Sequence, residues 1–431
     1  MKKIGVGLVG FGTVGAGVVS GLQRNGDLIA ERLGARPVLR KIADLDLDSD
    51  RGVTVDASLL TRDASEIIAD PEIQVVVELI GGTGAAKSVV EQALAKGKSV
   101  VTANKALLAD HGEEIFALAR ENGAGIYFGA SVGGGIPVIR ALREGLIANR
   151  IETVYGILNG TCNYILKRME EAGLSFDDAL AEAQEAGFAE ADPTLDVDGY
   201  DTAHKAAIIA RLAHGLNVPS EGVCIEGIRG LADEDIEYAH DLGYKIKLLA
   251  IIKRDGQDVE LRIHPTLVPV AHMLASVNGV FNAVMISGDM VGETLYYGRG
   301  AGREPTASTV LADVSDAVLD FASGAGGGRP VSGSGSNGVR LKAMGDVETR
   351  YYFRLSVLDK PGTFAEIASV LGAHDISIAS VLQKEEQQVG KHVSVVIVTH
   401  HAKESRVVEA LEKIDAMGIV GAATIVLRIE D

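Results

Sequence analysis

The sequence predicts an α/β protein with a Rossmann-like doubly wound dinucleotide-binding domain, an α+β domain and a ferredoxin-like module, in that order along 431 residues. Three observations predict this fold class. A glycine-rich turn follows a short apolar strand near the N-terminus, alternating strands occupy residues 225–268, and the pattern after residue 350 reads β-α-β-β-α-β. A chain of this length has room for about three domains.

Composition excludes several classes of partner. The net charge is −18, with 47% hydrophobic and 23% charged residues, which is typical of a globular enzyme. Binding to nucleic acid or to anionic membranes depends on clustered Lys and Arg, so neither is expected. Cys162 and Cys224 are the two cysteines, too few for a disulfide scaffold and wrongly spaced for a zinc cluster. A reducing cytoplasm is the expected location.

The N-terminal segment carries a dinucleotide-binding fingerprint. Residues 3–9 are predicted to form a buried strand, and a helix follows the glycine turn. Glycines allow a tight turn and close backbone approach, so a pyrophosphate can sit at the helix N-terminus. The expected cofactor-binding residues of this turn are Gly10, Phe11, Gly12, Thr13, Val14 and Gly15.

Asp44 ends the second predicted strand, residues 37–43, which follows a segment expected to be an insertion, residues 24–36. A carboxylate at this place normally binds the ribose hydroxyls and favours NAD. Arg40 and Lys41 lie close by and either serve the 2′-phosphate of NADP or are simply solvated. The sequence does not decide between NAD and NADP.

Two further apolar runs extend the predicted parallel sheet. Residues 73–80 are typical of a strand that is covered on both faces, and residues 99–102 form the next strand after a helix over 85–96. Lys105 follows at the carboxyl end of a strand, where ligands collect in doubly wound sheets. A solvated loop lysine is the alternative, and the position favours a functional role.

An acidic segment, interrupted by a proline and a glycine, lies between residues 189 and 205. Asp201 and Lys205 stand four apart at the start of a predicted helix, so their side chains share one face. As a surface ion pair they would contribute about 0.3–0.5 kcal/mol. A calcium loop is rejected, because Lys205 occupies the place of its bidentate glutamate. A lysine held among carboxylates suits a small ammonium-bearing substrate with a proton to move.

Three sequence segments resemble homoserine dehydrogenase in order and spacing: TANKALLA (102–109), GILNGTCNYIL (156–166) and AQEAGFAEADPTLDVDGYDTAHK (183–205). The resemblance covers roughly residues 1–320. It implies an enzyme that interconverts L-homoserine and L-aspartate 4-semialdehyde with NAD or NADP. Such an enzyme serves threonine, methionine and isoleucine biosynthesis.

The resemblance also implies roles for individual residues. Lys205 is expected to be the general acid for aldehyde reduction and the base in reverse, and Lys105 to lie beside nicotinamide and substrate. A free lysine has a pKa of about 10.4, which burial lowers and neighbouring carboxylates raise. Expected substrate-binding residues are Thr161, Glu190, Asp196 and Asp201, and further cofactor contacts are expected at Gly187 and Gly302.

Members of the resembling family bind a sodium ion through backbone carbonyls and a glutamate. The carbonyls expected to bind it are those of Val132, Gly134 and Ile136. Gly129 stands where the family usually carries the glutamate. The resemblance therefore implies a cation site without its carboxylate.

The middle of the chain is expected to combine helices with antiparallel strands. Helices are predicted over 162–172 and 176–186, and the strands within 225–268 either cover these helices or form a dimer interface. A glycine-rich turn at 298–308 leads into a helix that ends near residue 321. A homodimer or homotetramer is expected.

Residues 323–338 are rich in glycine and serine and predict a flexible linker. The β-α-β-β-α-β module after it, with Asp-Lys-Pro-Gly at 359–362, resembles the ACT domain. That resemblance implies binding of an amino-acid effector at a domain interface, with threonine as the leading candidate, and a module that can be removed. The expected effector contacts are Asp359, Gly362, His374, Asp375 and Ile376.

The expected boundaries are 1–130 for the cofactor domain, 131–322 for the catalytic domain, 323–349 for the linker and 350–431 for the ACT domain. The end of the catalytic segment is allowed to return to the cofactor domain, because the turn before its last helix carries Gly302.

Two rival functions are weighed. Aspartate-semialdehyde dehydrogenase needs an activated cysteine, and nothing around Cys162 or Cys224 supplies a base. A catalytically inactive dinucleotide-binding amino-acid sensor is opposed by the combination of Glu190, Asp201 and Lys205.

Overall fold

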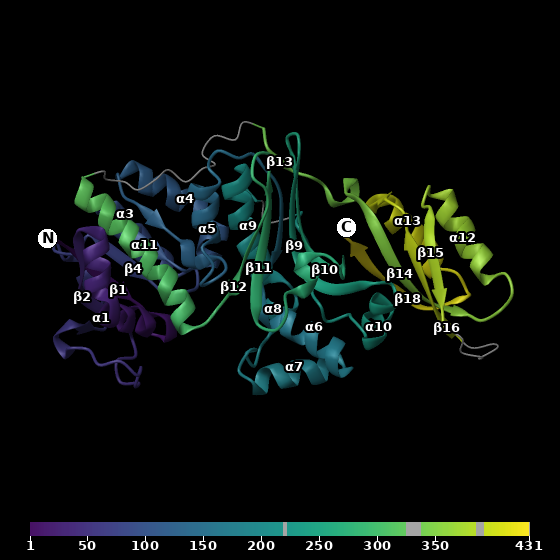
Figure 1. Cartoon of the computed structure of the whole chain (residues 1–431), viewed down its shortest axis with the longest axis horizontal. Coiled ribbons are helices and arrows are strands. Elements are labelled where there is room, and N and C mark those ends of the chain that lie inside the picture. The colour runs from purple at the N-terminus through teal and green to yellow at the C-terminus, as the bar shows by residue number, and fades with distance from the viewer. Residues whose placement is uncertain (219–221, 325–337, 385–391, 431) are drawn as a thin grey trace. The chain divides into compact units, whose positions relative to one another are not determined.

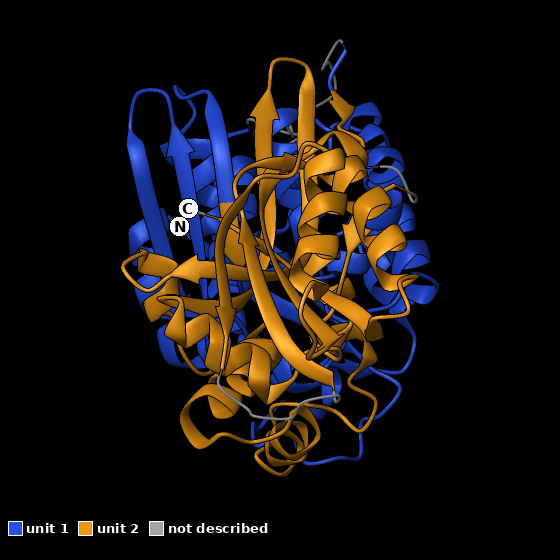
Figure 2. Cartoon of the chain, turned by 90° about the vertical axis from the view of Figure 1, so that its right-hand side faces the viewer, with its two compact units in different colours: residues 1–154, 204–220, 281–339 blue, residues 155–203, 221–280, 340–431 orange. Residues whose placement is uncertain are grey.

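The structure is a computed structural model that describes residues 1–218, 222–324, 338–384 and 392–430. The chain divides into two compact units, coloured separately in Figure 2. The first contains Met1–Val154, His204–Ser220 and Phe281–Val339, and the second contains Tyr155–Ala203, Glu221–Val280 and Arg340–Asp431. This division differs from the expected boundaries at 130, 322 and 349, because the chain passes from one unit to the other several times.

The first unit contains a parallel sheet in the order β3-β2-β1-β4-β5-β6 (Figure 1). Its strands are β1 (Lys2–Val9), β2 (Ala35–Ala43), β3 (Leu60–Thr61), β4 (Val75–Glu78), β5 (Ser99–Thr102) and β6 (Ile126–Tyr127). The helices between them are α1 (Thr13–Leu33), α2 (Ala64–Ala69), α3 (Ala85–Ala95) and α4 (Lys105–Glu121). This order confirms the predicted doubly wound fold.

Helix α1 is longer than expected, because it continues through residues 24–33 of the segment expected to be an insertion. It ends where Gly34 adopts a φ of 67° and its N–H donates to the carbonyl of Ala30. Asn25 and Gly26 resemble a turn signal in the sequence. Packing against another helix, described next, stabilises the helical form there despite the low propensity of these two residues.

Helix α11 (Arg303–Ser323) lies against α1 (Figure 1). The contact is close: a Cβ at Gly17 would lie 2.9 Å from the Cβ of Ala307, and one at Gly21 would lie 2.5 Å from Leu311. The apolar face of α11 joins the core of the parallel sheet. The end of the expected catalytic segment therefore returns to the cofactor-binding unit, together with the hairpin of β11 (Phe281–Gly288) and β12 (Gly292–Arg299).

The chain enters the second unit within β7 (Ile151–Ile157), and this unit is built on the antiparallel pair β9 (Tyr244–Asp255) and β10 (Asp258–Pro269). Helices α6 (Gly160–Ala172) and α10 (Asp233–Asp241) pack on β9, and α7 (Phe176–Glu185) packs on α6. The strands therefore cover helix α6, one of the two expected alternatives. The strands expected within 225–268 are present as β9 and β10, and a helix, α10, precedes them at residues 233–241. Three carboxylates in the first turn of α10 favour a helix there.

The C-terminal module has the predicted β-α-β-β-α-β order. Its elements are β14 (Glu348–Leu358), α12 (Thr363–Ala373), β15 (Ile378–Gln383), β16 (His392–Thr399), α13 (Glu404–Asp415) and β18 (Val420–Ile429). The strands lie in the order β18-β14-β16-β15, and both helices pack with them around one apolar core.

The sheet of this module continues into the catalytic strands of the same unit. Strand β18 pairs with β10 in parallel, with Arg428 opposite Thr266 and Ile429 opposite Leu267. The short strand β13 (Arg340–Leu341) pairs with β10 at its other end. Part of the expected linker, from Arg340 onward, is therefore ordered structure, and its residues 325–337 lie outside the described residues.

Buried charges reinforce this junction. Arg262 is only 1% exposed and donates from Nη2 to the carboxylate of Glu430, which also accepts bonds from Lys253 at 2.5 Å and from the hydroxyl of Tyr155 at 3.1 Å. Arg262 also contacts Glu260 at 3.3 Å. This junction argues against a removable module, because the last strand of the module completes the edge of β10 and its last described carboxylate neutralises Arg262.

Ending the chain at Ser323 should therefore leave a poorly soluble or unfolded second unit, since it removes β13 and β18 from β10. An unpaired strand edge also promotes aggregation. The yield of soluble protein and its thermal unfolding temperature measure this effect. A truncated enzyme with the unfolding temperature of the full chain would contradict the junction.

A point substitution separates the charge from the strand pairing. Glu430→Ala should lower the free energy of unfolding by about 3 kcal/mol, because it removes the nearer carboxylate from a buried guanidinium and leaves Glu260 and His264 as its partners. The matched control is Arg340→Ala, which removes an exposed ion pair from Arg340 of β13 to Asp258 of β10 and should leave the free energy of unfolding nearly unchanged. Urea denaturation of both variants gives the comparison.

Candidate active site

The predicted cofactor turn lies at the carboxyl end of β1. Gly10 has a φ of 100°, and a Cβ there would lie 2.6 Å from the carbonyl of Leu79. A Cβ at Gly15 would lie 2.1 Å from the oxygen of Gly10. A Cβ at Gly12 would meet no protein atom within 4 Å. Tight packing below the turn and open space above the N-terminus of α1 suit a bound pyrophosphate.

Asp44 stands at the end of β2, next to this turn. Its Oδ2 accepts a hydrogen bond from the N–H of Phe11, and its Oδ1 accepts one from the N–H of Asp46 at 2.9 Å. The two basic residues considered for a 2′-phosphate are already paired with other carboxylates: Arg40 with Glu72 at 3.4 Å, and Lys41 with Glu66 at 2.5 Å. These ion pairs therefore argue against a role for Arg40 and Lys41 in binding the 2′-phosphate of NADP.

Lys105 is the first residue of α4. The preceding residue, Asn104, caps this helix by accepting from the N–H of Leu107 at 3.1 Å, and its Nδ2 donates to the carbonyl of Gly82 at 2.7 Å. Asn104 thus ties the segment after β5 to the glycine loop after β4. The lysine is partly buried at the carboxyl edge of the sheet, as expected.

Glu78, at the end of β4, is a site residue that the sequence did not indicate. Its side chain is fully buried and accepts from the hydroxyl of Thr102 at 2.6 Å. The other carboxylate oxygen accepts from the N–H groups of Ile80 at 2.8 Å and Gly81 at 3.1 Å. This carboxylate therefore shapes the loop after β4 rather than contacting solvent. In the sequence, Glu78 is a polar residue within the apolar run 73–80, and nothing near it in the chain indicates its partners.

In the second unit, Asn159 brings two of the predicted substrate-binding carboxylates together. Its side-chain Nδ2 donates to Asp196 at 2.7 Å and to Asp201 at 2.9 Å. Its Oδ1 accepts from the N–H of Cys162 at 2.8 Å and so caps α6. Asn159 is 5% exposed and Asp201 is 7% exposed. We refer to Asn159, Asp196 and Asp201 as the clamp.

Asp196 belongs to the short helix α8 (Thr194–Val197). The neighbouring Asp198 faces elsewhere and pairs with Arg229 at 2.5 Å. The structure thus separates two carboxylates that look alike in the sequence. The thiol of Cys162 is fully buried and donates to the carbonyl of Asp196 at 3.2 Å, as a packed residue does.

Thr161 and Glu190 lie on either side of the clamp in the sequence. The hydroxyl of Thr161 donates to the carbonyl of Phe188 at 2.7 Å and fixes the loop after α7. In that loop the carboxylate of Glu190 is exposed, while its carbonyl accepts from Gln184 at 3.0 Å. Gly187 has a φ of 73° and ends α7.

Helix α9 (Tyr200–His214) carries both Asp201 and Lys205. They are one turn apart, as the sequence predicted, so their side chains leave the helix on the same face. Asp201 is buried and held by the clamp, whereas Lys205 is partly exposed.

The turn expected to bind a cation, residues 132–136, is buried at Val132, Gly134 and Ile136. The carbonyl of Ile136 accepts from the N–H of Val138 at 2.8 Å. A Cβ at Gly129 would lie 2.8 Å from Oδ1 of Asp313, so the carboxylate of Asp313 occupies the space that a side chain at 129 would need.

Asp313 is 8% exposed and its Oδ2 has no hydrogen-bond partner within the described residues. Burial and, to a smaller extent, the nearby Asp316 raise the pKa of Asp313 to about 7, although the backbone N–H groups of Gly129 and Ala130 lower it. A second carboxylate at position 129 would therefore meet a carboxyl that is already reluctant to ionise.

Gly302, the remaining predicted cofactor contact, is exposed with a φ of 114° and precedes α11 in the first unit. Its carbonyl accepts from the N–H of Thr306 at 3.1 Å. It therefore belongs to the unit that carries the glycine turn, as the resemblance implied.

The predicted effector residues lie at opposite ends of α12. Gly362 precedes the helix and Asp359 lies in the turn before it, while His374, Asp375 and Ile376 follow its end. Eleven helical residues separate the two groups by about 16 Å. His374 is bonded to Val370 at 2.8 Å and Lys413 at 2.9 Å, and Ile376 is buried. One module does not bring these residues into one pocket.

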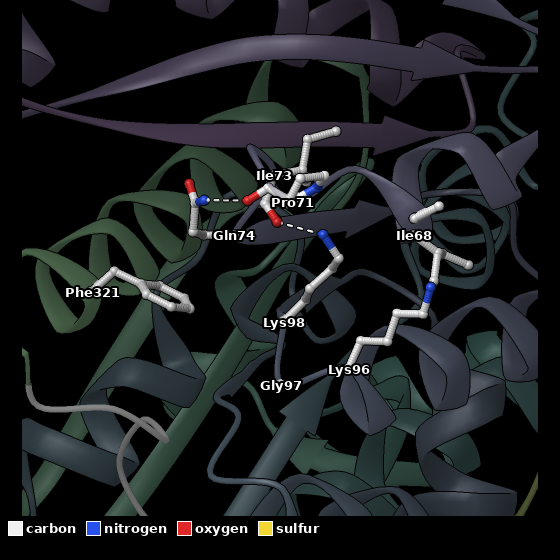
Figure 3. A pocket seen from close by; sticks show the side chains of 9 residues that line it. Ile68, Pro71, Ile73, Gln74, Lys96, Gly97, Lys98 and Phe321 are labelled. Carbon is white, nitrogen blue, oxygen red and sulfur yellow. Dashed lines mark hydrogen bonds between the residues drawn. The ribbon is translucent and has the colours of Figure 1, made fainter.

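Figure 3 shows a pocket at one edge of the parallel sheet, away from the cofactor turn. It lies at the amino ends of β4 and β5, and its lining includes Gln74, Lys98 and Phe321. Burial lowers the pKa of Lys98, whose ammonium donates to the carbonyls of Asp70 and Ile73, both at 2.5 Å. Lys98 therefore stabilises the segment that leads into β4, at the edge of the sheet opposite to the glycine turn.

Among the described residues, no group of three or more His, Cys, Asp or Glu side chains is arranged to bind a metal ion. In the same part of the chain, no helix has the length and apolar character needed to cross a membrane.

The comparisons with known families cover most of the chain. Residues 10–129 match the NAD-binding domain of homoserine dehydrogenase, residues 137–315 match homoserine dehydrogenase, and residues 351–416 match the ACT domain.

Characterised relatives match over the full length. The homoserine dehydrogenase of Pseudomonas aeruginosa is 45% identical and that of Bacillus subtilis 40% identical, each with 100% of this chain and 99% of the relative covered. The crystal structure of a homoserine dehydrogenase from Thiobacillus denitrificans superposes with a TM-score of 0.94 at 44% identity, covering 100% of this chain and 99% of that one. A hyperthermophilic archaeal homoserine dehydrogenase in complex with NADPH gives 0.62 at 29% identity, covering 74% of this chain and 98% of that one.

The glycine turn, the buried Asp201 one helical turn before Lys205, and these full-length matches agree. The chain belongs to the homoserine dehydrogenase family and carries a C-terminal ACT domain.

Proposed function

We propose that the clamp orients homoserine and that Lys205 moves its hydroxyl proton during NAD(P)-dependent interconversion of L-homoserine and L-aspartate 4-semialdehyde. When bound, the nicotinamide accepts or supplies the hydride. The observation that carries the proposal is the double hydrogen bond from Asn159 to Asp196 and Asp201. Asn159 holds both carboxylates in one orientation without neutralising them, so their negative charge stays available for a substrate ammonium or hydroxyl.

Lys205 suits the proton transfer because of its place on α9. It stands one turn after Asp201 on the same helical face, and it is partly exposed where the carboxylate is buried. We propose that it protonates the aldehyde oxygen in reduction and takes the hydroxyl proton in oxidation. Lys105 is proposed to contact substrate and nicotinamide from the N-terminus of α4, and Thr161 and Glu190 to complete the substrate contacts.

The corner at the end of β2 supports a preference for NAD. Asp44 presents a carboxylate beside the glycine turn, where ribose hydroxyls bind. A 2′-phosphate would meet that negative charge, and the nearby Arg40 and Lys41 are already paired with Glu72 and Glu66. The remaining proposed cofactor contacts are the backbone of residues 10–15, Gly187 and Gly302.

We propose that the enzyme works without a bound sodium ion, because Gly129 offers no carboxylate and Asp313 fills the adjacent space. The carbonyls of Val132, Gly134 and Ile136 remain as neutral groups. Neutral carbonyls bind a monovalent ion weakly, and Asp313 carries only part of a negative charge near neutral pH because its pKa is raised to about 7.

The ACT domain is proposed to bind threonine as a feedback effector. Its two groups of expected contacts lie at opposite ends of α12, which supports a site made by two modules in a homodimer or homotetramer. Both cysteines are free thiols, which agrees with the proposed cytoplasmic location.

Lys205→Ala should lower kcat for homoserine oxidation at least a hundredfold, the scale of a lost general acid–base group. Dinucleotide affinity, measured by fluorescence titration, should stay within about twofold, because Lys205 acts on the substrate proton. Asn159→Ala is the comparison: it frees two carboxylates and should raise KM for homoserine more than it lowers kcat. Near-normal turnover of Lys205→Ala would remove the lysine from the mechanism.

Homoserine oxidation followed at 340 nm with NAD and with NADP tests the cofactor and effector proposals together. The value of kcat/KM should be higher with NAD than with NADP. Asp44→Ala should bring the two values of kcat/KM closer together. Added threonine should reduce the rate cooperatively in the full chain. Equal values of kcat/KM for NAD and NADP in the wild type would refute the role of Asp44 in cofactor preference. A rate that does not change with added threonine would refute threonine as the effector.

Activity titrated against sodium and potassium in a choline background should be nearly flat. The expected change is less than about twofold, because the missing carboxylate removes the main charge from the site. A strong, saturable rise with either ion would show that the backbone carbonyls suffice.

A further inference from the structure

The second edge of β10 is paired with three short segments from different parts of the chain, all within the second unit. Strand β13 pairs at Asp258 and Val259, β8 (Cys224–Ile225) pairs at Arg262 and Ile263, and β18 pairs at Thr266 and Leu267. The middle segment therefore lies next to the last strand of the ACT domain, as Figure 1 lets the reader follow for β10 and β18. We call residues 224–229, which begin with β8, the strap.

The strap is bonded to the ACT domain at its first end. Arg428, in β18, is 4% exposed and donates from Nη1 to Glu226 at 2.8 Å. Its other guanidinium nitrogens bind the buried carboxylate of Glu404, at the start of α13. The N–H of Glu226 donates to the carbonyl of Ile263 at 2.8 Å. The position of Glu226 is therefore set jointly by β10 and by the ACT domain.

At its other end the strap holds the helix that carries Asp196. A Cβ at Gly227 would lie 2.1 Å from the carbonyl oxygen of Val197, so the two backbones touch and a side chain has no room. The N–H of Ile228, a fully buried residue, donates to that same carbonyl at 2.8 Å. Arg229 then pairs with Asp198 at 2.5 Å and contacts the hydroxyl of Thr194 at 3.3 Å.

These contacts form a continuous path of short range. It runs from Arg428 in the ACT domain through Glu226 to the backbone of Val197, next to the carboxylate of Asp196 in the clamp. Helix α8 has only four residues, too few to hold its own position, so the strap supplies the restraint.

We propose that the strap is a positioning element that couples the ACT domain to substrate binding, with Glu226 as its adjustable contact. The inference rests on the proposed role of the clamp and extends it to regulation. A shift of β18 upon effector binding moves Glu226, and through residues 227–228 it moves α8 and Asp196. Coupling of this kind changes substrate affinity without any effector contact in the active site.

The test compares Glu226→Ala with Asp258→Ala in the full-length enzyme. Both substitutions break an ion pair at the second edge of β10: Glu226 of the strap pairs with Arg428 of β18, and Asp258 of β10 pairs with Arg340 of β13. Both removed side chains are partly exposed. Only Glu226 belongs to the strap, whose next residues contact α8. Glu226→Ala should raise KM for homoserine about threefold to tenfold with little change in kcat, the range for a lost charged hydrogen bond that is partly exposed. Asp258→Ala should leave KM within about twofold.

Two further measurements exclude a merely structural effect. Glu226→Gln keeps an acceptor for Arg428 and should restore most of the homoserine affinity. Amide hydrogen exchange at residues 194–198 should quicken in Glu226→Ala and not in Asp258→Ala. In the double variant with Arg229→Ala, the KM effects should be less than additive, because both substitutions release the same helix.

The outcomes separate the strap from the clamp. If Asn159→Ala raises KM for homoserine while Glu226→Ala leaves KM and the exchange of residues 194–198 unchanged, the strap is refuted and the clamp stands. If Asn159→Ala also leaves KM unchanged, the clamp itself is refuted. An equal rise of KM in Glu226→Ala and Asp258→Ala would assign the effect to the stability of the β10 edge.

Discussion

The edge of strand β10 is the constraint on which the second unit depends. A buried strand must have its N–H and C=O groups paired on both sides, and β9 provides only one side. The other side is filled by β13, β8 and β18, which come from before the ACT domain, from the catalytic region and from the end of the ACT domain. The regulatory and catalytic parts are therefore joined by backbone hydrogen bonds rather than by side-chain contact alone.

Buried charge makes this junction specific. Arg262 and Arg428 are both nearly inaccessible, and each binds a carboxylate from the last strand or the last helix of the ACT domain. A guanidinium in such a place is tolerated only when its partners are in position. A slip of β18 along β10 would separate Arg262 from Glu430 and Arg428 from Glu226, so the charges fix the register that the backbone bonds alone would allow to vary.

The clamp also depends on buried charge, but here the negative charge of the carboxylates is preserved and not neutralised. Two carboxylates placed close together repel each other, and a lysine between them would cancel the charge that a substrate ammonium needs. The neutral amide of Asn159 donates one hydrogen to each and leaves both negative. Its oxygen caps α6, so the orientation of the amide is fixed by the helix it begins.

The sequence by itself determined the elements whose signals are local: the glycine turn before α1, the lysine at the end of β5, the Asp201–Lys205 spacing and the order of the ACT strands. Each rests on residues within one turn or one strand of each other. Only the tertiary structure decided that Asn159 joins Asp196 to Asp201, that Asp198 turns to Arg229, and that Asp313 occupies the space beside Gly129. It also decided that the last strand of the ACT domain pairs with β10. Strand pairing between residues 162 positions apart leaves no periodicity in the chain, and a buried carboxylate looks like any other until its partner is known.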